Sequence, residues 1–69
     1  MKPDEIMLYD AIKKRGNLME PSVLEIVRDL GLNEKRAAYI LDKWTNKGMY
    51  EWGVNVFFGW LTEEEVKSE

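Results

Sequence analysis

The strongest constraint on the fold is the segment Gly31-Leu32-Asn33, which separates two stretches whose apolar residues have helical spacing. Gly31 can adopt the positive φ that a sharp turn between helices requires. Leu32 can fill the inside of the corner, and Asn33 is a favoured N-cap for a following helix. Ala37 is small enough for two helices to cross closely. The pattern therefore predicts two helices joined by a tight turn.

Three helices are predicted from the spacing of apolar residues and from signals at the helix ends. The first runs from Pro3 to Arg15 and has acidic side chains in its first turn, basic ones in its last turn, and Gly16 as its stop. The second runs from Pro21 to about Leu30. The third covers residues 34–47. Its expected buried side consists of Ala37, Ile40, Leu41 and Trp44.

After residue 48 the spacing changes from helical to extended. Residues 49–52 and 56–61 are rich in aromatic and β-branched side chains, which favour strands. Gly53-Val54-Asn55 lies between them and is typical of a turn, so we expect a β-hairpin. Thr62 and Glu65 have the spacing of a capping box, and residues 63–69 are expected to form an acidic tail or a short helical turn.

Three helices followed by a hairpin, with the glycine turn between the second and third helix, resemble the winged helix-turn-helix superfamily. The resemblance extends from about Asp4 to Thr62 and implies one domain over residues 1–62. The implied fold is α+β, mostly α, with a three-helix helix-turn-helix core followed by a β-hairpin wing. The resemblance further implies that the helix at 34–47 lies in the DNA major groove and that the hairpin touches the backbone or the minor groove.

Composition excludes several classes of chemistry. The 69 residues contain neither cysteine nor histidine, so disulfides, thiolate metal sites, and the commonest general base are absent. No apolar run approaches the roughly 18 residues that a membrane span needs, and the first residues lack the layout of a signal peptide. We therefore expect a cytoplasmic protein that is not an enzyme and has no metal, cofactor or membrane partner.

The net charge of −3 arises at the end of the chain. Residues 1–61 carry nine basic and nine acidic side chains, whereas residues 62–69 carry four acidic and one basic. Long-range attraction to nucleic acid would therefore be weak, but a local basic face can still form.

The helix at 34–47 carries most of the candidate DNA contacts. At about 100° per residue, its outward side holds Lys35, Tyr39, Asp42 and Asn46, and one flank holds Arg36, Lys43 and Lys47. Asparagine and arginine can read base edges, and lysine can hold phosphate. The expected contacts to double-stranded DNA are Lys35, Arg36, Tyr39, Lys43, Asn46, Lys47 and, at the hairpin tip, Asn55. The function expected from them is sequence-specific binding as a small transcriptional regulator.

Other interpretations of this helix and of the hairpin remain open. The basic residues of this helix could simply solvate an exposed face. Asp42 would repel phosphate, and the hairpin tip has no lysine or arginine, although the resemblance leads one to expect a basic wing.

Aromatic residues of the hairpin support an alternative function. Period-2 alternation places four of them on one face of the ribbon. They are Tyr50, Trp52, Phe58 and Trp60. This face is either an exposed surface for a protein partner or a homodimer, or the inner face that packs over Trp44 and the first helix. A shift of one residue in register would exchange the two faces.

Overall fold

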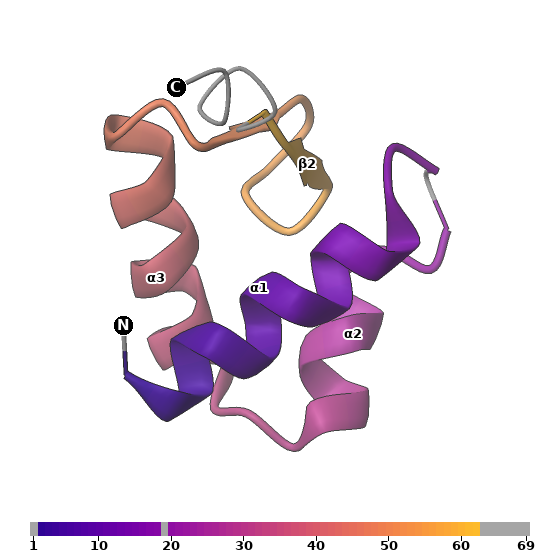
Figure 1. Ribbon diagram of the computed structural model, residues 1–69, viewed down its shortest axis with the longest axis vertical. Helices are drawn as coiled ribbons and strands as arrows, with labels where there is room; N and C mark the ends of the chain where they lie inside the picture. The colour runs from indigo at the N-terminus through magenta and orange to yellow at the C-terminus, as the bar shows by residue number, and fades with distance from the viewer. Residues whose placement is uncertain (1, 19, 63–69) are drawn as a thin grey trace.

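The computed structural model describes residues 2–18 and 20–62. The elements are α1 (Pro3–Arg15), α2 (Val23–Leu30), α3 (Glu34–Asn46), β1 (Tyr50–Trp52) and β2 (Gly59–Leu61). The predicted α+β class is confirmed: three helices are followed by a two-stranded antiparallel hairpin, an order consistent with a helix-turn-helix plus a wing (Figure 1). The acidic segment 63–69 lies outside the described residues.

Two helix boundaries differ from the predictions. Helix α2 begins at Val23 instead of Pro21, because Ser22 is the N-cap and its hydroxyl accepts a hydrogen bond from the Glu25 amide at 3.2 Å. Helix α3 ends at Asn46, and Lys47 is its C-cap. The bounds of α1 are as predicted.

The turn between α2 and α3 forms as the sequence predicts. Gly31 lies in the left-handed region, with φ 74° and ψ 22°, and its amide donates to the Arg28 carbonyl. The amide of Leu32 donates to the Val27 carbonyl at 3.1 Å. Asn33 caps α3, because its side-chain oxygen accepts from the Arg36 amide at 2.9 Å. These contacts set the direction in which α3 leaves α2.

The core lies where the three helices and the hairpin meet. Helix α1 crosses the other two helices and also packs against β2, while α3 packs against β1 (Figure 1). The predicted buried side of α3 is confirmed, since all four of its residues are at most 1% exposed. The buried hydrophobic residues are Leu8, Ile12, Val23, Ile26, Val27, Ala37, Ile40, Leu41, Trp44 and Tyr50.

The hairpin loop is longer than predicted, and this changes the faces of the ribbon. Six residues, 53–58, connect the strands, whereas the turn signal indicated three. The strands pair Tyr50 with Leu61, Glu51 with Trp60 and Trp52 with Gly59. Compared with a three-residue turn, the longer loop shifts the pairing of the strands by an odd number of residues. Trp60 therefore lies opposite Glu51 and shares its face of the ribbon. The prediction of four aromatic side chains on one face is therefore wrong.

Tyr50 is a core residue and not part of an exposed interface. It is 1% exposed, and its hydroxyl donates to the Val56 carbonyl at 2.7 Å. Tyr50 belongs to the same buried cluster as Trp44. For this residue, the alternative in which the aromatic face packs inward over Trp44 is therefore the correct one. Burial raises the pKa of the Tyr50 hydroxyl above its usual range.

Gly59 allows the Tyr50 ring to lie against β2. A Cβ at position 59 would overlap the Glu51 carbonyl oxygen and would come within 2.7 Å of the Tyr50 ring. The Gly59 carbonyl also accepts a hydrogen bond from the Arg15 guanidinium at 2.5 Å. The same guanidinium donates to the Pro21 carbonyl at 2.9 Å, so Arg15 joins the hairpin to the segment before α2.

We predict that Gly59→Ala lowers the free energy of unfolding by about 2 kcal/mol, because the new methyl group overpacks a backbone contact. Gly53→Ala is the matched control in the same hairpin, since a Cβ there meets nothing within 4 Å. Urea denaturation followed by tryptophan fluorescence measures both. Equal stability of the two variants would contradict the packing described for Gly59.

Candidate nucleic-acid interface

The outward face of α3 is exposed, as the helical spacing predicts. Lys35, Tyr39, Asp42 and Asn46 are all exposed, and Tyr39 is 59% exposed. Their positions follow from the burial of the opposite side of the helix against α1 and α2. A lysine, a phenol and an amide on one helical face can donate to phosphate and base edges, whereas Asp42 would repel phosphate.

Arg36 and Lys43, from the predicted basic flank, are paired with carboxylates of α1. Arg36 Nε lies 2.9 Å from Asp4 Oδ2, and Arg36 Nη2 lies 3.3 Å from Glu5 Oε2. Lys43 Nζ lies 2.9 Å from the same Glu5 oxygen. Two cations of α3 therefore meet two anions of α1, which cancels much of the positive charge on this flank. Arg36 is directed toward α1 and not toward the outward face of the helix.

Glu5 is a residue of this region that sequence reasoning missed. It is 4% exposed, and it was not among the predicted core or site residues. The sequence does contain a sign that Glu5 is buried. Glu5, Leu8 and Ile12 are separated by three and four residues, which places all three on one side of α1. A carboxylate on the buried side of a helix requires a cationic partner. The sequence could therefore have indicated a buried ion pair, although not which cations form it.

These pairs keep the carboxylates ionised. The hydrogen bond from Lys43 lowers the pKa of Glu5, and the hydrogen bond from Arg36 lowers the pKa of Asp4. The same contact with Asp4 raises the pKa of Arg36. Asp4, Glu5 and Arg36 are therefore charged at neutral pH, and their charges offset one another there.

The Tyr39 ring lies close to the same two cations. The Arg36 guanidinium carbon and the Lys43 ammonium each lie 5.8 Å from the centroid of its ring. These are cation–π distances. The carboxylates of α1 thus orient Arg36 and Lys43, which in turn hold the exposed Tyr39 ring on the outward face.

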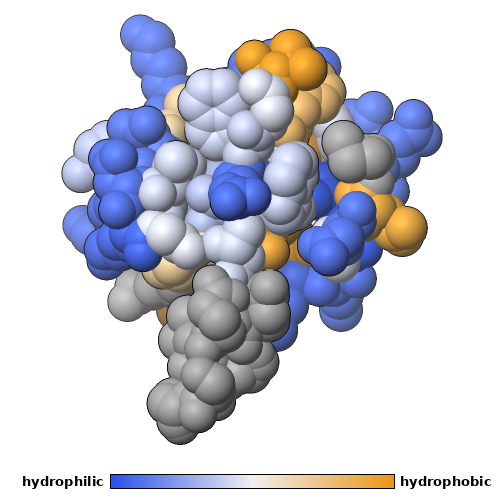
Figure 2. Space-filling model, turned by 90° about the horizontal axis from the view of Figure 1, so that it is seen from above, coloured by the Kyte–Doolittle hydropathy of each residue, from blue (hydrophilic) through white to orange (hydrophobic). Residues whose placement is uncertain are grey.

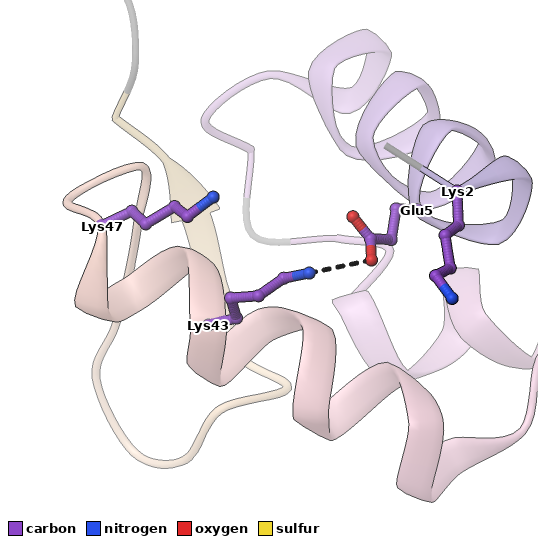
Figure 3. Close-up of a pocket in the computed structure, with 4 residues that line it drawn as sticks. All are labelled: Lys2, Glu5, Lys43 and Lys47. Atoms are coloured by element: carbon purple, nitrogen blue, oxygen red, sulfur yellow. Dashed lines mark hydrogen bonds and ion pairs between the residues drawn. The ribbon is translucent and has the colours of Figure 1, made fainter.

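Lys47 contributes to an open depression between α1 and α3. The depression is lined by Lys2, Glu5, Lys43 and Lys47 and has a volume of about 460 Å³. Lys43 and Lys47 extend from α3 toward α1, and Lys43 reaches Glu5 (Figure 3). Lys47 therefore belongs to a site with Lys2, a residue that was not predicted to contact a ligand.

The hairpin presents a smaller apolar surface than the sequence predicted. Trp52 is 40% exposed, Phe58 38% and Val54 87%, whereas Trp60 is partly buried on the opposite face. Asn55, a predicted DNA contact, is exposed, and its side-chain oxygen accepts from the Phe57 amide at 2.8 Å. Its amide group therefore stabilises the loop in which it lies.

Figure 2 looks down on the end of the molecule that carries the hairpin. Strongly hydrophilic residues lie on both sides of this view, and the centre is mostly weakly polar with hydrophobic residues beside it. The exposed apolar residues of the hairpin, Trp52, Val54 and Phe58, follow α3 in the chain and are not part of its outward face.

The described residues limit other kinds of site. Within 2–18 and 20–62, no group of three acidic side chains is arranged to hold a metal ion. No helix in these ranges is long and apolar enough to cross a membrane. Comparison of the chain with family models, with curated proteins and with solved structures finds no match.

The ion pairs predict a dependence of stability on acidity. The ordinary pKa is 4.5 for Glu5 and 3.8 for Asp4, and both are lowered in the folded state. Each ionised carboxylate therefore stabilises the fold at pH values above its ordinary pKa. This contribution is lost as the pH falls through the lowered pKa values. We expect wild-type stability to fall in acid, and we expect Glu5→Gln to be less stable at neutral pH with a smaller loss on acidification.

Urea denaturation between neutral pH and about pH 3 measures this dependence. Asp10→Asn is the control, because it removes an exposed carboxylate from the same helix. Parallel stability curves for wild type and Glu5→Gln would show that the ion pairs of Glu5 do not stabilise the fold.

Proposed function

We propose that this protein is a small winged helix-turn-helix protein that binds double-stranded DNA with α3 in the major groove. The observation that carries the proposal is the exposed polar face of α3, which follows the tight glycine turn from α2. A helix presented in this way, with a hairpin directly after it, has the arrangement of helix-turn-helix readers. Sequence-specific binding as a transcriptional regulator is the role that we infer.

The proposed contacts divide by chemistry. Lys35, Tyr39 and Asn46 are placed for the groove, since their side chains are exposed on the outward face. Lys43 and Lys47 are placed for phosphate on the flank. Arg36 is assigned a supporting role, because its guanidinium holds Asp4 and Glu5. The hairpin would approach the DNA through Asn55 and backbone amides.

Charge limits the strength of this binding. Residues 1–61 are neutral overall, and Asp42 lies among the proposed groove contacts. Most of the non-specific affinity would come from a few local lysine–phosphate contacts, so it would be weak and would fall steeply with salt.

We predict that Lys35→Glu weakens binding to a random-sequence DNA duplex by about tenfold or more at low salt, because a cation that faces the groove becomes an anion that the DNA repels. The matched control is Lys14→Glu, which makes the same charge change at an exposed site on α1 beside Leu30 of α2. Fluorescence anisotropy at several salt concentrations measures both. Binding that is absent in wild type, or equally weak in the two variants, would refute DNA binding through α3.

A second candidate is a protein-interaction surface on the hairpin. The observation that favours it is the exposure of Trp52, Val54 and Phe58 at one end of the ribbon. Partly exposed aromatic side chains are frequent anchors of protein interfaces. The partner that can be tested directly is a second copy of the chain, which would also present two copies of α3 to a palindromic DNA site.

We predict for this candidate that wild type self-associates and that Trp52→Ser or Phe58→Ser raises the dissociation constant by roughly thirtyfold, as loss of an interface anchor of about 2 kcal/mol would. Leu18→Ser is the control, because Leu18 is 67% exposed but lies outside the hairpin. Sedimentation equilibrium over a range of protein concentrations gives the constants. A strictly monomeric wild type would exclude the homodimer.

A further inference from the structure

The depression between α1 and α3 concentrates positive charge at a single place. Lys2 precedes α1, whereas Lys43 lies in the last turn of α3 and Lys47 is the C-cap of that helix. Among the described residues that line the depression, Glu5 is the acidic one, and the other three are lysines. Figure 3 shows Lys43 and Lys47 extended from α3 toward α1 and Lys2 on the other side of Glu5.

The existing contact shows that Lys43 can bind an oxygen anion here. Its ammonium donates to Glu5 Oε2 at 2.9 Å, and an ammonium has three protons to donate. Lys2 and Lys47 are exposed, and no hydrogen bond or ion pair engages their ammonium groups among the described residues. Donors for a second, external anion are therefore present around the internal one.

A phosphate diester within a polymer is an anion that this site can bind. Its two unesterified oxygens carry one negative charge and can accept from several ammonium groups at once. The depression is open to solvent and polar, so a polymer can pass across it without burying its chain. It also lies on the flank of α3, where the edge of a DNA groove would bring backbone phosphates.

We propose that Lys2, Lys43 and Lys47 form a subsite for one backbone phosphate of DNA, with Glu5 as a built-in competing anion. The inference rests on the proposed function, because it places α3 against DNA. Lys2 and Lys47 bind the phosphate from the two sides of the depression, and Lys43 is shared between the phosphate and Glu5. Glu5 orients Lys43 and reduces the net charge of the site.

The salt dependence of DNA binding tests this subsite. The slope of log affinity against log salt changes by about 0.9 for each phosphate contact that is lost. We expect the double variant Lys2→Ala/Lys47→Ala to lose about this much slope, since both lysines bind the same phosphate. We expect Glu5→Gln to bind the duplex more tightly than wild type, because the competing anion is removed.

Two matched controls separate local contacts from net charge. Lys14→Ala removes an exposed lysine on the α2 side of α1, and Asp10→Asn removes an exposed carboxylate of the same helix. Neither residue lines the depression. Lys2 and Lys47 are exposed, so thermal denaturation should show that their variants remain folded.

The outcomes distinguish the subsite from DNA binding itself. A slope that falls in the double variant but not in Lys14→Ala, with tighter binding by Glu5→Gln than by Asp10→Asn, supports the subsite. A duplex-binding wild type whose double variant behaves like Lys14→Ala overturns the subsite but leaves the proposed function intact. If neither wild type nor Glu5→Gln binds a duplex at low salt, both proposals fail.

Discussion

The ion pairs of Glu5 connect the packing of the helices to the surface that α3 presents. A carboxylate that is 4% exposed requires cationic partners, and it finds them in Arg36 and Lys43 of α3. The pairs hold α1 against α3 at a defined angle and rotation. They also hold both cations near the Tyr39 ring, each 5.8 Å from its centroid. One interaction thus influences the helix packing, the local charge and the aromatic side chain on the outward face.

The hairpin depends on a different constraint, the close approach of Tyr50 and Gly59. The Tyr50 ring occupies the space that a side chain at position 59 would fill, and Arg15 binds the Gly59 carbonyl from α1. These contacts place the inner face of the hairpin on the core. Within the loop at 53–58, Val56 and Phe57 pack against the core, whereas Val54 is 87% exposed. The apolar surface at this end is therefore a consequence of the register.

The charged and apolar surfaces are compatible with both proposed roles. The outward face of α3 and the depression beside it carry the cations suited to a phosphate backbone. The hairpin surface carries none, so its contribution to DNA binding would be through backbone amides and shape.

The sequence by itself determined the features that depend on neighbouring residues. Gly31 and Asn33 set the turn and the start of α3, and the spacing around Trp44 set which side of α3 is buried, because caps and helical faces arise from contacts within about four residues. Only the tertiary structure decided that Glu5 meets partners 31 and 38 positions away, and that a six-residue loop moves Trp60 to the face of Glu51. Ion pairs between helices and strand register depend on how whole elements pack, and local patterns do not specify that arrangement.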